Sequence, residues 1–169
     1  YNVWFGAMLI GRSFVGIRAG DVNRLVHYLR NNPKIDAGHI AAVAHGRMGP
    51  VLLHAAAFEP AIARIALVDA LATYDSIVMN EFYKPELIHA TVPGALTAYD
   101  LPDLAATLAP RPLLIAGAVD QIERPADLDA VRATIRAARR SCHVELTTLL
   151  IPGRNDSPDE LAELVDFVA

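Results

Sequence analysis

The chain has 169 residues, with 15 Lys and Arg against 19 Asp and Glu, 53% apolar residues and a single cysteine. This length accommodates one hydrophobic core, and the apolar fraction excludes a disordered chain. A formal net charge of −4 without a basic run argues against nucleic acid or an anionic membrane as a partner. The lone Cys142 allows no internal disulfide and no structural zinc site, so we expect no metal and no cofactor.

The N-terminal residues indicate neither a signal peptide nor a membrane anchor. No positively charged segment followed by an apolar run is present, and no apolar run approaches the roughly 20 residues that span a bilayer. The sequence does not indicate a compartment. Because the chain begins with Tyr1 rather than methionine, we expect it to be an internal piece, a processed product or the continuation of an upstream segment.

Short apolar runs alternate with amphipathic segments along the chain. Apolar runs bounded by glycine or proline are typical of strands buried on both faces of a parallel sheet, and apolar residues spaced by three and four are typical of helices. In chain order we predict a helix over 17–30, a strand over 39–44, a helix over 48–58, strands over 63–68 and 112–116, a helix over 125–139, a strand over 144–151 and a closing helix over 158–168.

This order of elements predicts one α/β domain over residues 1–169. Strands that alternate with helices form βαβ units, and therefore a three-layer α/β/α architecture with a doubly wound, mostly parallel sheet. Residues 70–111 interrupt the alternation with four prolines and only short helical pieces. We expect this segment to be a lid-like insertion over the carboxyl ends of the strands.

Three turns follow predicted strands and are the places where a ligand is expected. In open parallel sheets, ligands bind at the carboxyl ends of the strands. The three turns have the sequences AHGRMGP, GAVDQIERP and IPGRNDSPDE.

The order of these segments resembles a known family. A strand, a glycine-rich turn and a helix are followed by LLHAAAFEPAIARIALVD, by RPLLIAGAVDQIERP and by a strand ending in IPG. This order is similar to the C-terminal half of an α/β-hydrolase, in the acetyl-xylan-esterase and dienelactone-hydrolase-like branch, over about residues 38–169. The resemblance implies a carboxylic-ester hydrolase fold and a small ester or carbohydrate as the ligand.

The resemblance also implies that the catalytic triad is degenerate. The family's nucleophile elbow is GxSxG; aligned with it, His45 takes the position before the nucleophile and Gly46 takes the position of the serine. The family's acid position falls on Asp120 and its base position on Asp156. Glycine has no side chain with which to attack a carbonyl, and a carboxylate does not replace imidazole as a base near neutral pH.

We therefore expect a non-catalytic hydrolase-like module. One amide of the family's oxyanion hole would lie upstream of Tyr1, and four parallel strands alone would leave an apolar edge unpaired. The rest of the polypeptide, or another chain in an assembly, is expected to cover that edge. The alternative is an active esterase or peptidase-type hydrolase whose nucleophile lies elsewhere, with His45, Asp120 and Asp156 assisting the attack of water.

A second alternative comes from a different class of protein. AHGRMG is a relaxed form of GxGxxG, and Asp69 follows Gly46 by 23 residues, near the spacing of a Rossmann dinucleotide site. Against this interpretation, His45 and Arg47 are bulky where a pyrophosphate must approach. Arg47 is a candidate for anion binding, whereas Ser13 is expected to cap a helix and Cys142 to be a structural thiol.

Overall fold

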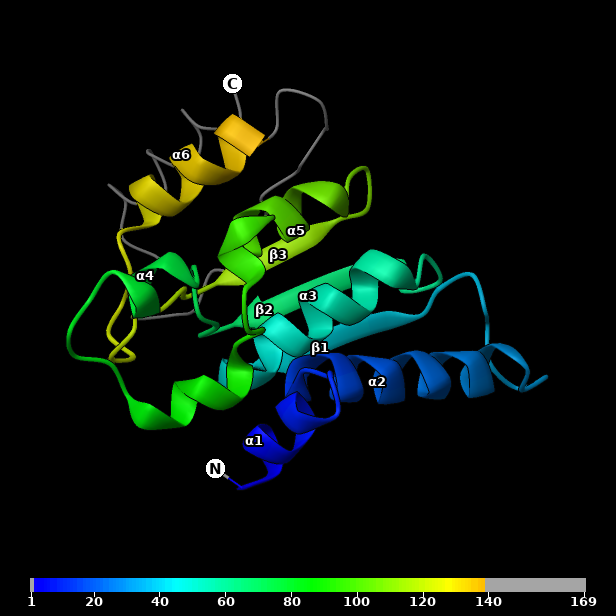
Figure 1. The fold of residues 1–169 in the computed structure, drawn as a ribbon. Helices are drawn as coiled ribbons and strands as arrows, with labels where there is room; N and C mark the ends of the chain where they lie inside the picture. Colours follow the sequence, from blue (N-terminus) through cyan, green and yellow to red (C-terminus); the bar gives the residue numbers. More distant parts are fainter. Residues whose placement is uncertain (1, 139–169) are drawn as a thin grey trace.

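The computed structural model of this chain describes residues 2–138 (Figure 1). The strand predicted over 144–151, the closing helix over 158–168, Cys142 and Asp156 lie outside the described residues. In chain order the elements are α1 (Asn2–Leu9), α2 (Phe14–Arg30), β1 (Ala41–His45), the 3₁₀ turn η1 (Gly46–Met48), α3 (Gly49–Phe58), β2 (Arg64–Val68), α4 (Asp75–Val78), the 3₁₀ helices η2 (Pro85–Ala90) and η3 (Ala95–Thr97), α5 (Leu101–Thr107), β3 (Leu113–Ala116) and α6 (Leu128–Ala138).

The described strands form a parallel sheet in the order β1-β2-β3. β2 lies in the centre, with Ala44 of β1 opposite Leu67 and Ile115 of β3 on its other side. Because all three strands run the same way, their carboxyl ends meet at one edge of the sheet. The predicted α/β class with a parallel sheet is confirmed.

Helices α2, α3 and α5 pack against one face of this sheet, and Figure 1 shows them side by side over the strands. Side chains alternate between the two faces of a strand, so every second residue points at these helices. The core on this face comprises Ala44, Ile65, Leu67 and Leu113 from the strands, Val15, Ala19 and Val26 from α2, Val51, Leu52, Ala55 and Ala56 from α3, and Leu101, Ala105 and Leu108 around α5.

The opposite face of β1 is open in the structure. Val43 is 72% exposed, whereas the adjacent Ala44 is 5% exposed. The expectation that this strand is buried on both faces is therefore wrong for β1, because the helices packed against it lie on the other side. An apolar run in the sequence does not distinguish a strand covered on one face from a strand covered on two.

Helix α2 begins three residues earlier than the sequence predicts. The Ser13 side chain accepts a hydrogen bond from the Gly16 amide at 2.9 Å, which satisfies one of the amides left free in the first turn. The expected capping role of Ser13 is confirmed. The helix ends at Arg30, as predicted.

One carboxylate organises the segment between β2 and β3. Asp100 accepts hydrogen bonds from the amides of Tyr74, at 2.7 Å, and Leu101, at 2.6 Å, and from the hydroxyl of Thr73. It also caps α5, which packs against α3 and α6. Asp100 therefore ties the start of the insertion to its last helix; a lid function for residues 70–111 stays a prediction.

None of the described helices is long and apolar enough to cross a bilayer.

Candidate functional site

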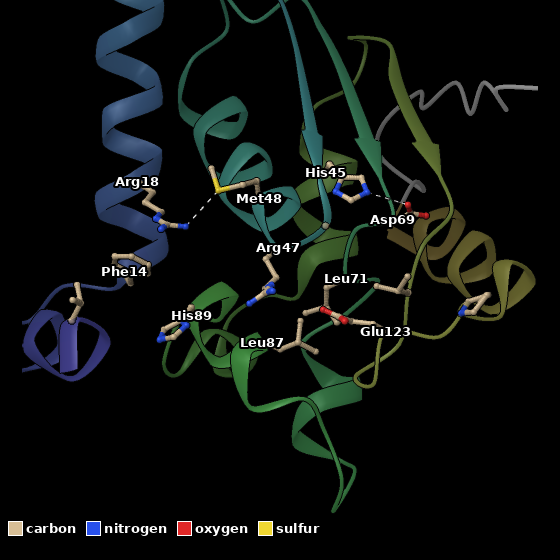
Figure 2. Close-up of a pocket in the computed structure, with 14 residues that line it drawn as sticks. Phe14, Arg18, His45, Arg47, Met48, Asp69, Leu71, Leu87, His89 and Glu123 are labelled. Carbon is tan, nitrogen blue, oxygen red and sulfur yellow. Dashed lines mark hydrogen bonds and ion pairs between the residues drawn. The ribbon is translucent and has the colours of Figure 1, made fainter. Parts of the chain in front are cut away.

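A cavity of about 840 Å³ lies at the carboxyl ends of the strands (Figure 2). Its wall is built from the ends of all three strands, from α2 and from the insertion, so residues far apart in the sequence meet there. This is the position at which parallel sheets bind ligands, and the volume is within the range of small-molecule sites. The described lining residues are Val3, Phe14, Arg18, His45, Gly46, Arg47, Met48, Asp69, Leu71, Leu87, His89, Val119, Glu123 and Pro125.

A sharp turn joins β1 to α3 at this cavity. Gly46 immediately follows the strand with φ of +55°, a conformation that side-chain-bearing residues rarely adopt. The chain then enters η1 and continues directly into α3. A Cβ on Gly46 would meet no heavy atom within 4 Å, so a side chain at this position would have room.

Close packing behind the turn fixes where α3 begins. A Cβ on Gly49 would lie 2.5 Å from the Cβ of Ala70, the residue that follows Asp69. Only glycine allows the first turn of α3 to approach the end of β2 this closely. This contact holds the turn at the carboxyl edge of the sheet.

His45 and Asp69 form a pair across two strand ends. The Nε2 atom of His45 lies 3.2 Å from Oδ2 of Asp69, and the side chains are 75% and 54% exposed. Such an exposed pair contributes little to stability. It does orient the imidazole ring at the edge of the cavity, as Figure 2 shows.

The backbone around the cavity is unusual at two acidic residues. Asp69 and Glu123, with φ of +48° and +61°, are the non-glycine residues with positive φ between positions 2 and 138, and both line the cavity. The Asp69 amide donates to the Ala116 carbonyl at 2.8 Å, and a Cβ on Gly117 would lie 2.5 Å from Oδ1 of Asp69. Backbone strain of this kind gathers at functional sites.

Cationic side chains occupy the part of the wall nearest α2. The Arg18 guanidinium carbon lies 4.2 Å from the centre of the Phe14 ring, and Nη1 lies 3.5 Å from the sulfur of Met48. Arg47 extends from the turn after β1. Desolvation lowers the pKa of His89, and the nearby charges of Arg18 and Arg47 lower it further.

The described part of the wall holds no serine, threonine or cysteine. Ser13 lies outside this wall and caps the N-terminus of α2. Nor do residues 2–138 contain a group of three or more His, Cys, Asp or Glu side chains that could hold a metal ion. The chemistry that the described wall offers is therefore an imidazole paired with a carboxylate, a second imidazole, two guanidinium groups and a second carboxylate.

Solved structures supply the comparison, since neither a protein-family model nor a curated protein matches the sequence. A putative acetyl xylan esterase from Bacteroides fragilis matches with a TM-score of 0.67 at 17% identity, over 93% of this chain and 41% of that one. The glucuronoyl esterase catalytic domain from Hypocrea jecorina matches with a TM-score of 0.55 at 17% identity, over 89% of this chain and 49% of that one. An acetyl xylan esterase from Paenibacillus sp. R4 matches with a TM-score of 0.51 at 15% identity, over 88% of this chain and 50% of that one. The chain has the fold of part of an α/β-hydrolase.

This hydrolase-like chain spans half or less of the length of those esterases. The sequence predicted a resemblance to part of an α/β-hydrolase near the acetyl xylan esterases. These structures confirm that prediction for the fold. The same likeness favours an α/β-hydrolase-like fold over a Rossmann dinucleotide-binding fold. Asp69, whose spacing from Gly46 suggested that alternative, contacts His45.

The structure brings two of the four expected triad-related residues to the cavity. His45 and Gly46 both line it. Asp120 follows the lining residue Val119, and its Oδ1 accepts hydrogen bonds from the amides of Ile122 and Arg124, each at 2.9 Å. Burial alone would raise the pKa of Asp120, but these amides and the Arg124 charge outweigh it and lower the pKa. Asp156 lies outside the described residues, so the acid and base assignments stay predictions.

Sequence reasoning did not assign Arg18, His89 and Glu123 to this site. The helical pattern of α2 places Arg18 on a polar face, but nothing local indicates that this face ends at a cavity. His89 and Glu123 come from loops whose paths depend on tertiary contacts. The position of Asp69 at a strand end was a usable signal, because carboxyl ends of adjacent parallel strands meet.

Proposed function

We propose that this chain is a degenerate ester-hydrolase-like module that binds a small ester or carbohydrate in its cavity and forms no acyl-enzyme. The observation that supports this most directly is Gly46 at the apex of the turn between β1 and α3. In the α/β-hydrolase fold the nucleophile stands on such a strand-to-helix turn. Here the turn is kept and the attacking side chain is missing.

The composition of the cavity wall supports the same proposal. Covalent acyl transfer requires a hydroxyl, thiol or comparable nucleophile activated by a base. The described wall offers no hydroxyl and no thiol. Its apolar residues, among them Phe14, Leu71 and Leu87, together with a few convergent polar groups, are the usual composition of a binding site for a small molecule.

The similar structures support carbohydrate esters as the class of ligand. Their names describe acetyl xylan esterases and glucuronoyl esterases. A cavity of about 840 Å³ accommodates a molecule of that size. We extend the likeness to binding and not to turnover, because the residue that would carry turnover is a glycine.

The module is proposed to work within a larger polypeptide or assembly. Among the described residues β1 pairs with β2 alone, and Val43 on its outer face is 72% exposed. An exposed apolar edge is a template for association. We assign its cover to the remaining part of the polypeptide or to another chain.

Hydrolysis of p-nitrophenyl acetate by the full-length protein tests the non-catalytic proposal. The assay compares the wild type with Asp120→Asn, which keeps an oxygen for the amides of Ile122 and Arg124, and with Asp36→Asn as a matched exposed control. We expect equal rates in all three proteins. We also expect no labelling of this chain by a fluorophosphonate, which reacts with activated serines.

A different outcome would contradict the proposal. If Asp120→Asn lowers the rate by about a hundredfold while Asp36→Asn leaves it unchanged, Asp120 belongs to a working acid–base pair. Fluorophosphonate labelling mapped to a serine of this chain would have the same meaning. Either result would establish an active hydrolase.

A second candidate function is hydrolysis without a covalent intermediate, and the His45–Asp69 pair favours it. An imidazole oriented by a carboxylate can take a proton from water as the water attacks an ester carbonyl. This candidate predicts slow hydrolysis that falls in both His45→Gln and Asp69→Asn. If both variants retain the wild-type rate, it is excluded.

A further inference from the structure

Two arginines from different elements line the same cavity without a carboxylate partner among residues 2–138. Arg18 comes from α2 and Arg47 from the turn after β1. The described ion pairs engage other cations: Arg24, Arg30, His39, His45, Lys84 and Arg124. Two guanidinium groups that line one cavity favour an anion as its ligand.

Arg18 is held in place by apolar and aromatic contacts. Its guanidinium stacks over Phe14 at 4.2 Å and approaches the Met48 sulfur at 3.5 Å. A cation over an aromatic face loses little of its ability to donate hydrogen bonds from its edge. The contact with Phe14 therefore orients Arg18 and leaves part of its guanidinium fork available.

Arg47 is held by its position in the chain. It follows Gly46 directly and lies in η1, whose start is fixed by the strand and whose end is fixed by the packing of Gly49 on Ala70. Figure 2 shows its side chain extending into the cavity toward the insertion. His89, which lies near both arginines, faces the same space from η2.

The acidic residues of the cavity do not neutralise these arginines. Asp69 pairs with His45, and Glu123 pairs with Lys84 from the insertion. Each acid that lines the described wall thus already has a cationic or imidazole partner. Positive charge is left over on the α2 side of the cavity, next to the apolar side chains of Phe14 and Leu87.

We infer that the ligand of this cavity carries an oxyanion group, a carboxylate or a phosphate, which Arg18 and Arg47 bind together while its apolar body contacts Phe14. Guanidinium groups match both kinds of oxyanion with paired, charge-assisted hydrogen bonds. This inference rests on the proposed function, since it specifies the ligand class for the same cavity.

Calorimetric titration of the full-length protein with three probes of similar shape tests the inference. The probes are benzoate, phenyl phosphate and neutral benzamide. We expect benzoate or phenyl phosphate to bind about tenfold or more tightly than benzamide, and which anion binds better identifies the group. Raising the ionic strength from about 0.05 to about 0.5 M should weaken the binding of the two anionic probes and leave the binding of benzamide unchanged.

Variants assign the binding to the two arginines. Arg18→Met and Arg47→Met keep the aliphatic part of the side chain. Each should weaken binding of the anionic probe by about tenfold and leave the affinity for benzamide unchanged. Arg24→Met, on the same helix and outside the cavity, is the control and should change neither. Thermal melts of all variants verify that they fold.

The outcomes separate this inference from the proposed function. Equal binding of all three probes, unaffected by Arg18→Met and Arg47→Met, overturns the oxyanion site while the cavity keeps its role in binding. Binding of none of the probes overturns the oxyanion site and also contradicts a ligand-binding cavity. The non-catalytic part of the proposal is decided separately, by the ester-hydrolysis assay.

Discussion

Gly46 combines a backbone conformation with an open surrounding, and the two have opposite consequences for substitution. Its φ of +55° disfavours any side chain, whereas a Cβ there would meet no atom within 4 Å. We expect Gly46→Ser and Gly46→Ala each to lower the free energy of unfolding by about 1–2 kcal/mol, the cost of a left-handed conformation. Urea denaturation measures it; equal stability of the two variants and the wild type would contradict the strained turn.

The same serine variant separates strain from chemistry. Because Nε2 of His45 is engaged by Asp69, we expect the new hydroxyl to remain unreactive, so Gly46→Ser should resist fluorophosphonate to the same extent as Gly46→Ala. Rapid labelling of Gly46→Ser alone would show that a base still reaches the turn. His45 would then be the first group to substitute.

His54 makes the stability of the core depend on pH. It is 7% exposed, its Nδ1 donates to the Pro50 carbonyl at 2.6 Å, and its Nε2 accepts from the Tyr99 hydroxyl at 2.8 Å. Desolvation lowers the pKa of His54 more than the bond to Pro50 raises it. As pH falls below the ordinary value of about 6.5, the unfolded chain therefore takes up a proton that the folded chain does not, and stability is lost.

Melting temperatures at about pH 7.5 and about pH 5 check this expectation. The wild type should melt lower at the acidic pH, and His54→Leu should show a smaller difference between the two. Exposed His27 on α2 provides the control, since His27→Leu should keep the wild-type difference. Identical pH dependence in the wild type and His54→Leu would refute the role of His54.

At the scale of elements, Arg111 joins the end of α3 to the start of β3. Its guanidinium donates to the carbonyls of Ala56, at 2.7 Å, Glu59, at 3.2 Å, and Ile62, at 3.1 Å. These groups lie at or just past the helix C-terminus, where carbonyls lack partners within the helix and positive charge is favourable. Partial burial lowers the pKa of Arg111, but the group stays charged at neutral pH.

Removing this guanidinium should destabilise the whole sheet edge. We expect Arg111→Met to lower the free energy of unfolding by about 2–3 kcal/mol, because it leaves carbonyls unsatisfied, and Arg111→Lys to lower it by about half as much. Urea denaturation gives both values, with exposed Arg12→Met as the control. A loss below about 0.5 kcal/mol in Arg111→Met would mean that water replaces the guanidinium without penalty.

The sequence predicted elements better than it predicted contacts. The apolar runs located β1, β2 and β3 to within two residues, and glycine-rich turns located the strand ends, because these features are local. The exposure of Val43 was missed, since hydrophobicity does not record which face is covered. The His45–Asp69 pair was also missed: the two residues are 24 positions apart, and their contact depends on β1 and β2 being adjacent.

The candidate site likewise has a part that the sequence predicted and a part that it did not. The turn at Gly46 was predictable because it depends on a short motif between a strand and a helix. The cationic wall was not, because Arg18 reaches the cavity only through the packing of α2 on α3. The folded structure thus adds what a one-dimensional pattern lacks, which is the set of residues that different elements bring to one place.

At the scale of the whole molecule, the outer face of β1 determines how the chain behaves on its own. Val43 of β1 is 72% exposed, and among the described residues β1 pairs with β2 on one side only. Apolar strand edges associate, and a charged residue on the edge suppresses association. We therefore expect the isolated 169-residue chain to self-associate, and Val43→Lys to shift it toward the monomer.

Size-exclusion chromatography with light scattering, over a range of protein concentrations, measures this shift. Val78→Lys is the matched control: Val78 is 67% exposed but lies in α4 and not in a strand, so its substitution should leave association unchanged. If association depends on β1, only the Val43 variant responds. A wild-type chain that stays monomeric and melts cooperatively at every concentration would show that the edge needs no cover, and the proposed assembly would fail with it.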